Sequence, residues 1–154
     1  PFPPVQYAFE AIGFAKISMS GAEAREIGFL RPTDGITINR DHLIHDAKDR
    51  VLAMAREFKP LQERTISLPG KGGRLALEYA ADNFRRSGQI TEYEYLMAKR
   101  FARVLTGGDT HPSEEVTERR ILELEKECFL SLCGEPKTME RIQAMLTTGK
   151  PLRN

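Results

Sequence analysis

The spacing of apolar residues is the feature that most constrains how this chain can fold. In segment after segment these residues recur at helical spacing, and prolines or glycines separate the segments. Few stretches show the period of two that a half-buried strand needs. The pattern therefore predicts an all-α fold of about seven helices, with a brief extended stretch at 36–38. We place the helices at residues 5–17, 20–28, 39–58, 74–86, 91–105, 113–133 and 138–147.

Two helix starts carry a specific signal. Ser20 with Glu23, and Thr91 with Glu94, have the spacing of a capping box, in which each side chain accepts a hydrogen bond from the other residue's backbone. The helix after Thr91 has apolar side chains on more than one face, which predicts a central position. In the helix at 113–133, an apolar seam predicts a buried face. The seam consists of Ile121, Leu124, Cys128 and Leu132, with Leu122 and Phe129 beside it.

Composition excludes several classes of protein. Of the 154 residues, 40% are apolar and 29% charged, which is typical of a globular domain and too apolar for a disordered one. The 23 basic side chains nearly balance the 22 acidic ones, without the excess typical of proteins that bind nucleic acid or a membrane surface. No apolar run is long enough to span a bilayer.

The cysteines and the first residues suggest a cellular context. Cys128 and Cys133 are five residues apart, which fits neither a redox pair nor half of a zinc site. They are interpreted as core thiols in a reducing compartment, and we expect a cytoplasmic protein. The segment 1–4, which holds three prolines and no initiator methionine, is interpreted as a linker within a longer polypeptide.

Two histidines are the candidates for a metal site. His42 and His45 have the i,i+3 spacing that puts both rings on one helix face. There is no HExxH motif, and nothing in the sequence fixes a third ligand. Because His45 can equally pair with Asp49 one turn later, a solvated helix face is favoured and no metal ligand is assigned.

A glycine-rich segment is the candidate for a phosphate site. Gly70-Lys71-Gly72-Gly73-Arg74 precedes a predicted helix, where free backbone N–H groups and two cations could hold a phosphate. The spacing is not that of a P-loop, and no buried strand comes before it. A flexible connector is the favoured interpretation.

The fourth and fifth predicted helices resemble a helix-turn-helix, because only the turn 87–90 separates them. Their cations could contact phosphates of nucleic acid. Glu92 and Glu94, however, stand at the start of the would-be recognition helix, where base contacts need donors. Packed helices are therefore favoured. The cations are Arg85, Arg86, Lys99, Arg100 and Arg103.

No constellation for nucleophilic catalysis is visible. Neither cysteine has a histidine near it in sequence, and no serine lies in a nucleophile elbow. From the residues alone, the chain is a helical piece without a recognisable active site.

Three stretches carry a resemblance to a known family. Residues 7–30 resemble the segment that follows the catalytic core of crotonase (enoyl-CoA hydratase) proteins, and 124–129 with 138–151 resemble the C-terminal crotonase helices. The whole chain is most similar to the C-terminal region of long bacterial 3-hydroxyacyl-CoA dehydrogenases. The order and spacing of these stretches carry the resemblance. It implies post-core helices at 1–59, a helical insertion at 60–112 and C-terminal helices at 113–154, packed as one unit.

The resemblance also implies a function for the longer protein. Such enzymes oxidise 3-hydroxyacyl-CoA with NAD and hydrate 2-enoyl-CoA in fatty-acid β-oxidation. Their dehydrogenase and hydratase residues precede this stretch, so we expect a fragment without catalytic residues or cofactor. Its partners would be the upstream dehydrogenase and crotonase-like domains, acyl-CoA in the longer protein, and another copy of itself.

One contact with CoA can be carried over from the family. Its C-terminal helices place a phenylalanine and a lysine near the adenine of CoA. Phe129 matches the phenylalanine, while the lysine position falls on Thr148, with Lys150 two residues on. Phe129 and Lys150 are therefore the candidate CoA-binding residues, although Phe129 also fits the apolar seam of its helix. The alternative interpretation is a freestanding helical binding module, with nucleic acid as the candidate ligand of its helix-turn-helix-like pair.

Overall fold

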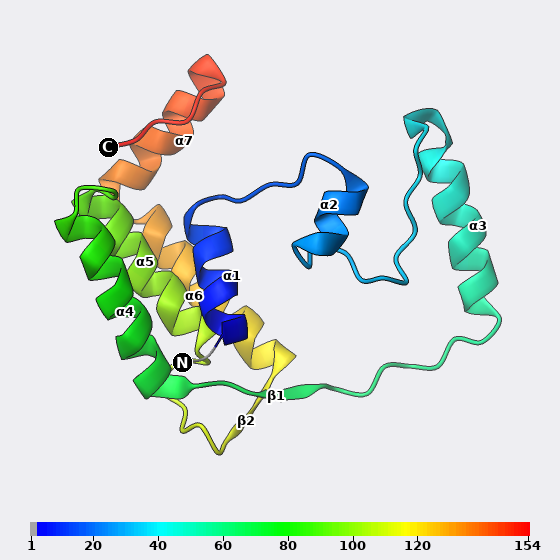
Figure 1. Cartoon of the computed structure of the whole chain (residues 1–154), viewed down its shortest axis with the longest axis horizontal. Helices are drawn as coiled ribbons and strands as arrows, with labels where there is room; N and C mark the ends of the chain where they lie inside the picture. The colour runs from blue at the N-terminus through cyan, green and yellow to red at the C-terminus, as the bar shows by residue number, and fades with distance from the viewer. Residues whose placement is uncertain (1–2) are drawn as a thin grey trace. The chain divides into compact units, whose positions relative to one another are not determined.

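The computed structural model describes residues 3–154, and within them the fold is all-α, as predicted (Figure 1). Seven α-helices, one 3-10 helix and two three-residue strands make up its regular structure. The helices are α1 (Pro3–Gly13), α2 (Gly21–Glu26), α3 (Leu43–Ala55), α4 (Gly70–Arg86), α5 (Glu92–Leu105), α6 (Glu118–Cys133) and α7 (Pro136–Thr148). The 3-10 helix is η1 (Arg40–His42), and the strands are β1 (Thr65–Ser67) and β2 (Glu115–Thr117).

Contacts divide the chain into two compact units. Unit 1 combines residues 1–14 with 63–154, and unit 2 is the intervening segment 15–62. This division follows packing, whereas the expected boundaries after residues 59 and 112 come from a family resemblance and stay a prediction. In the described part, no helix is long and apolar enough to cross a membrane.

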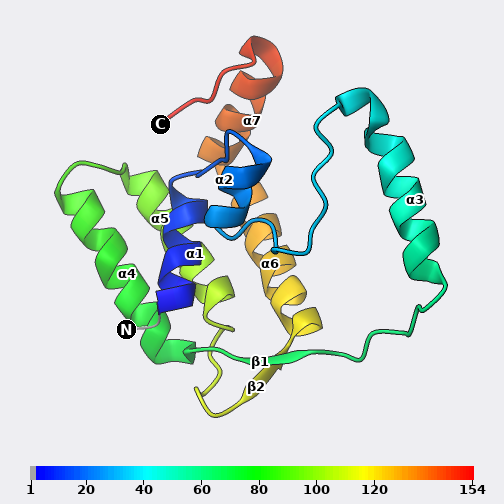
Figure 2. The same ribbon diagram turned by 45° about the vertical axis from the view of Figure 1, so that its right-hand side comes forward.

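Helix α5 is central in unit 1, as its wide apolar surface predicts. It packs against α1, α4 and α6, which surround it in both views (Figure 2). The core cluster joins Phe9 of α1, Leu77 and Ala81 of α4, and Ala102 of α5. Ala102 is fully buried because its small side chain lets neighbouring helices approach α5 closely.

A two-stranded antiparallel ribbon closes one end of unit 1. Thr65 lies opposite Thr117, and Val116, which is 3% exposed, anchors the ribbon. Neither strand was predicted, because three residues are too few to show a period. The extended stretch expected at 36–38 forms no strand.

Most helix ends follow local chemistry. The capping box of Thr91 and Glu94 is complete, as predicted. At Ser20 only half of the predicted box forms, because Ser20 accepts from the amide of Glu23 but the Glu23 carboxylate accepts from the amide of Met19 at 2.6 Å. Gly149 ends α7 in the left-handed conformation with φ of 66°. The expected linker at 1–4 is wrong for Pro3 and Pro4, which belong to α1, and lies outside the described residues for the first two positions. Proline at the start of a helix loses no hydrogen bond, so α1 can begin there.

Unit 2 is held mainly by polar contacts. The guanidinium groups of Arg25 and Arg50 donate to the backbone carbonyls of Asp34 and Thr33, at 2.5 and 3.0 Å. Ala24 is buried, whereas α3 has no buried residue. The apolar stripe that predicted α3 is therefore uncovered, with Ile44 at 81% exposure.

Candidate functional site: an apolar groove on unit 1

Helix α6 turns only part of its apolar surface into the core. Leu124 and Leu132 are buried, as the predicted seam requires, but Leu122 and Phe129 are 57% and 64% exposed. Apolar side chains of this size are normally covered, so contiguous exposed ones indicate a surface that another body contacts. Helix α7 is similar, because Met139 is 54% exposed.

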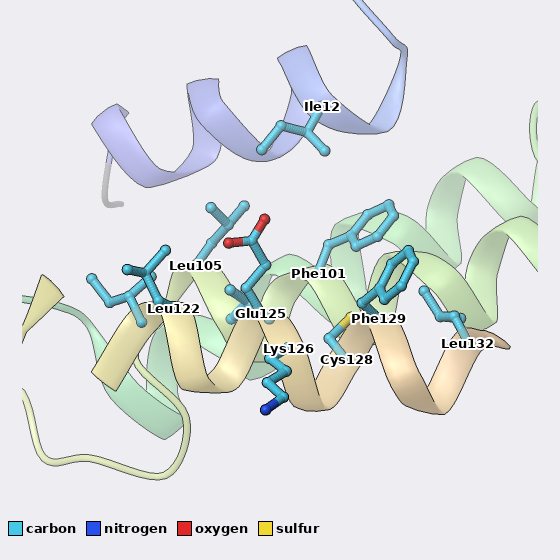
Figure 3. Close-up of a pocket in the computed structure, with 11 residues that line it drawn as sticks. Ile12, Phe101, Leu105, Leu122, Glu125, Lys126, Cys128, Phe129 and Leu132 are labelled. Atoms are coloured by element: carbon cyan, nitrogen blue, oxygen red, sulfur yellow. The ribbon is translucent and has the colours of Figure 1, made fainter. Parts of the chain in front are cut away.

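The exposed side of α6 forms one wall of a groove. Helices α1 and α5 supply the rest, and the cavity volume is about 670 Å³ (Figure 3). Nine of the eleven lining side chains are apolar or a thiol, and the other two are charged. They are Ile12, Phe101, Val104, Leu105, Ile121, Leu122, Glu125, Lys126, Cys128, Phe129 and Leu132.

The two charged side chains that line the groove point in different directions. The Glu125 carboxylate points into the space between α6 and α1, whereas the Lys126 ammonium points away from it (Figure 3). Burial raises the pKa of the Cys128 thiol, so this cysteine is a poor nucleophile at neutral pH. The groove thus offers apolar surface and one carboxylate, which suit binding rather than covalent chemistry.

The two candidate CoA residues belong to different segments, Phe129 to α6 and Lys150 to the residues after α7. Phe129 lines the groove, so the interpretation of this side chain as core is wrong. Lys150 follows the end of α7 and is exposed, with its amide N–H donating to the Thr148 hydroxyl at 3.2 Å. Among residues 3–154, no hydrogen bond, ion pair or cation–π contact joins Lys150 with Phe129.

The histidines of the metal candidate lie on an exposed surface. His45 Nε2 is 3.4 Å from the Asp49 carboxylate, as the i,i+4 alternative predicts. His42 belongs to η1, before α3 begins. In residues 3–154, no three histidine, cysteine or acidic side chains gather as metal ligands.

The glycine-rich segment is neither a connector nor an open cradle. It forms the first turn of α4, which begins at Gly70 rather than at Arg74. Gly70 donates its N–H to the Thr106 carbonyl at 3.0 Å, so that amide is occupied. Arg74 Nη1 binds Asp109 at 2.7 Å. The glycines and Arg74 therefore serve a close contact between the start of α4 and the 106–110 loop.

The same contact decides whether the glycine segment could bind NAD. Dinucleotide sites need a glycine turn between a buried parallel strand and a helix, with free amides facing the pyrophosphate. Here the strand before the glycines is the exposed β1 of an antiparallel ribbon, and Gly70 and Gly73 are buried. The glycine segment at the start of α4 therefore does not fit the pyrophosphate of NAD.

The cations of the helix-turn-helix candidate all have partners within unit 1. Arg85 binds Asp82 and Glu92, each at 2.6 Å, and Arg86 binds Asp82 at 2.5 Å. Arg100 donates to the Ser131 hydroxyl and Arg103 pairs with Glu127 at 3.2 Å. Lys99 lies 4.8 Å from the centre of the Tyr95 ring. Helix α5 is packed on three sides, so it is not free to enter a DNA groove.

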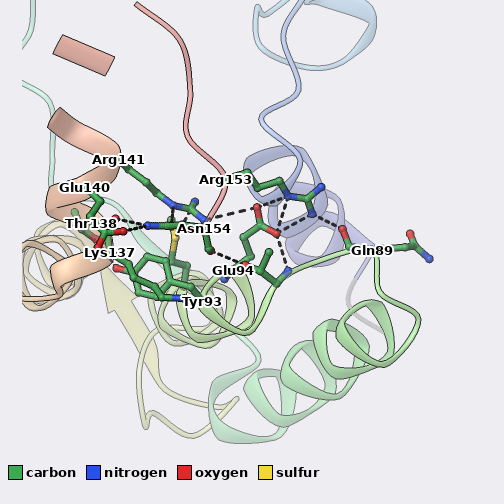
Figure 4. A network of polar contacts seen from close by, with 11 residues as sticks. Gln89, Tyr93, Glu94, Lys137, Thr138, Glu140, Arg141, Arg153 and Asn154 are labelled. Carbon is green, nitrogen blue, oxygen red and sulfur yellow. Dashed lines mark hydrogen bonds and ion pairs between the residues drawn. The ribbon is translucent and has the colours of Figure 1, made fainter. Parts of the chain in front are cut away.

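A polar network at the end of the chain was not predicted. The Arg153 guanidinium binds the Glu94 carboxylate at 2.8 Å and donates to the Gln89 carbonyl (Figure 4). Asn154 accepts from Arg141 Nε at 2.7 Å, and its carbonyl accepts from the Thr91 hydroxyl at 3.1 Å. The network ties 153–154 to α5 and α7. Sequence spacing gives no signal for contacts between residues 59 positions apart.

The fold and groove define a helical unit that offers an apolar binding surface, with no catalytic constellation in its described residues. Over 155 aligned residues that include the whole chain, it is 41% identical to a probable 3-hydroxyacyl-CoA dehydrogenase of Bacillus subtilis (strain 168). The match lies at the C-terminal end of that relative, and the chain spans 20% of the relative's length. No protein-family model and no solved structure matches this chain.

Proposed function

We propose that this chain is the C-terminal helical part of a longer 3-hydroxyacyl-CoA dehydrogenase. The longer protein would oxidise 3-hydroxyacyl-CoA with NAD in fatty-acid β-oxidation. The 41% identity along the whole chain is the observation that carries the proposal. NAD would be held by the part of the protein that precedes these residues.

The chain's own role in this proposal is packing. Exposed apolar side chains on α6 and α7, together with the groove, supply surface for the rest of the enzyme or for a neighbouring subunit. No residue of the chain is assigned a catalytic role. The free thiols Cys128 and Cys133 agree with a reducing compartment, and we place the protein in the cytoplasm.

Two finer parts of the proposal rest on the resemblance alone. The longer protein would also carry an enoyl-CoA hydratase part of the crotonase type just before this chain. Phe129 and Lys150 would then lie near the adenine of bound acyl-CoA. The exposure of both side chains leaves them accessible to such a ligand.

The test compares three polypeptides: the longer protein, the longer protein without these 154 residues, and this chain alone. NADH formation from a 3-hydroxyacyl-CoA and hydration of crotonyl-CoA are measured for each. We expect both activities in the longer protein and neither in this chain. Turnover by this chain alone would defeat the proposal, as would a longer protein without dehydrogenase activity.

A further inference from the structure

We propose that the groove between α1, α5 and α6 receives a segment of the same polypeptide that precedes this chain. The segment presents apolar side chains together with a lysine or arginine that pairs with Glu125. This inference rests on the proposed function, because it requires the longer protein. The preceding part of the polypeptide is seated on this surface of unit 1.

The lining of the groove favours a protein segment over a small ligand. Pockets for small molecules combine apolar walls with several polar groups that converge on the ligand. Among the lining residues that the structure describes, Glu125 is the only one whose polar group points into the groove, while Phe129 and Leu122 lie open on its α6 wall (Figure 3). A volume of about 670 Å³ accommodates several aliphatic side chains.

Glu125 supplies charge complementarity. Within residues 3–154 its carboxylate has no ion pair and no hydrogen bond, unlike Glu123 and Glu127 of the same helix, which pair with Arg120. Covering the groove with a wholly apolar body would bury this charge without compensation, which is costly. The occupant must therefore bring a cation to this point.

The position of α1 favours the same polypeptide as the source. About four-fifths of the relative's length lies outside the matched region, which is its C-terminal 20%. Preceding residues would enter this chain through α1, and Ile12 of α1 lines the groove. A segment joined to the start of α1 by a short linker would have an effective concentration of roughly millimolar, above that of a separate molecule.

Alkylation of the two native cysteines tests the proposal. Cys128 lines the groove, and Cys133 of the same helix does not, so it serves as an internal reference. Rates of reaction with iodoacetamide are read for each cysteine by peptide mass spectrometry. They are compared in the longer protein and in this chain, diluted until sedimentation gives a monomer. We expect Cys128 to react about tenfold more slowly in the longer protein, with little change at Cys133.

Two neighbouring residues provide matched variants. Phe129 and Leu130 are exposed to 64% and 59%, but only Phe129 lines the groove. In the longer protein, Phe129→Glu should return Cys128 to the rate seen in this chain, whereas Leu130→Glu should not. We expect both variants to keep their helices because neither residue is buried, and circular dichroism checks this.

Three results would overturn the proposal. Equal Cys128 rates in the two proteins would mean that the groove stays open. Protection that disappears when the longer protein is diluted would assign the groove to a second copy. If added palmitate slowed the alkylation of Cys128 in this chain, the groove would be assigned to an acyl chain. Cysteine protection is read without any turnover, so a dehydrogenase assay on the same sample separates failure here from failure of the proposed function.

Discussion

At the residue scale, Gly70 shows how one position fixes the start of a helix. Its φ is +56°, a left-handed conformation that side chains other than glycine rarely adopt. A Cβ atom there would overlap the carbonyl oxygen of Thr110. The backbone of α4 therefore approaches the 106–110 loop closely because this residue has no side chain.

Replacing Gly70 tests this contact. We expect Gly70→Ala to lower the free energy of unfolding by about 2–4 kcal/mol, through both backbone strain and overlap. Gly88→Ala is the control, because Gly88 has φ of +73° but a Cβ atom added there would meet nothing within 4 Å. It should cost only about 1–2 kcal/mol. Urea unfolding measures both, and equal losses would contradict the role of the Thr110 contact.

The Glu94 carboxylate makes two separate structural interactions. It accepts the Thr91 amide N–H at 2.8 Å, completing the capping box, and it binds Arg153. The hydrogen bond from Arg153 is the main reason that the pKa of Glu94 lies below its ordinary value of 4.5. Stability linked to this group is therefore complete above pH 4.5 and falls as the pH drops through the lowered pKa.

The variant Glu94→Gln isolates the charge, because glutamine can still accept the capping hydrogen bond. We expect it to be less stable than the parent chain at about pH 7, with a difference that shrinks steadily below pH 4.5. Unfolding by urea at a series of pH values measures the difference. A difference that is constant with pH would show that Arg153 does not favour the ionised form of Glu94.

At the scale of elements, α7 is attached in an unusual way. None of its residues is buried. Its attachment to α5 is polar and aromatic: the Tyr93 and Thr138 hydroxyls share a hydrogen bond, and Arg141 lies 5.2 Å from the centre of the Tyr93 ring. Residues 153–154 complete this attachment (Figure 4).

Removing the side chains of the polar network should loosen α7. In the double variant Arg153→Ala with Asn154→Ala, we expect amide hydrogen exchange in α7 to accelerate by roughly tenfold, while α4 is unchanged. Lys150→Ala is the matched control, since it removes a cation of the same segment that contributes no contact to the network. Mass spectrometry of peptides from α7 gives the rates. Acceleration by Lys150→Ala alone would contradict the assignment.

Local signals predicted the elements well where a few neighbouring residues decide the outcome. Helix α5 is the clearest case, because Thr91, Glu94 and the apolar pattern are all local. Helix α6 begins at Glu118 rather than at Ser113, since residues 115–117 pair with β1 instead. The partner strand is 50 positions away in sequence, as Thr65 and Glu115 show, so no local pattern could indicate it.

At the scale of the whole molecule, the burial of apolar side chains is incomplete in both units. Exposed large apolar residues occur on α3, α6 and α7, including Ile44, Phe129 and Leu146. Monomeric proteins rarely leave such surface in contact with water. This exposure is what the proposed packing against a longer polypeptide would relieve.

A chain with this surface should self-associate when it is studied alone. We expect its weight-average mass in sedimentation equilibrium to rise with concentration, because association removes apolar surface from water. Moderate sulfate should strengthen the association, since this salt favours apolar burial. A monomer at every concentration and salt condition would contradict the expectation.

The sequence by itself determined the helical class, the central place of α5 and the two capped helix starts, because apolar period and capping depend on residues within a few positions. It also carried the resemblance that the 41% identity supports in its dehydrogenase part. Only the tertiary structure decided that Phe129 is open rather than buried, that Gly70 is packed against a loop, and that Arg153 binds Glu94. An amphipathic pattern shows which face of a helix is apolar enough to favour burial. Whether another element packs against that face depends on residues distant in sequence, whose approach no local pattern records.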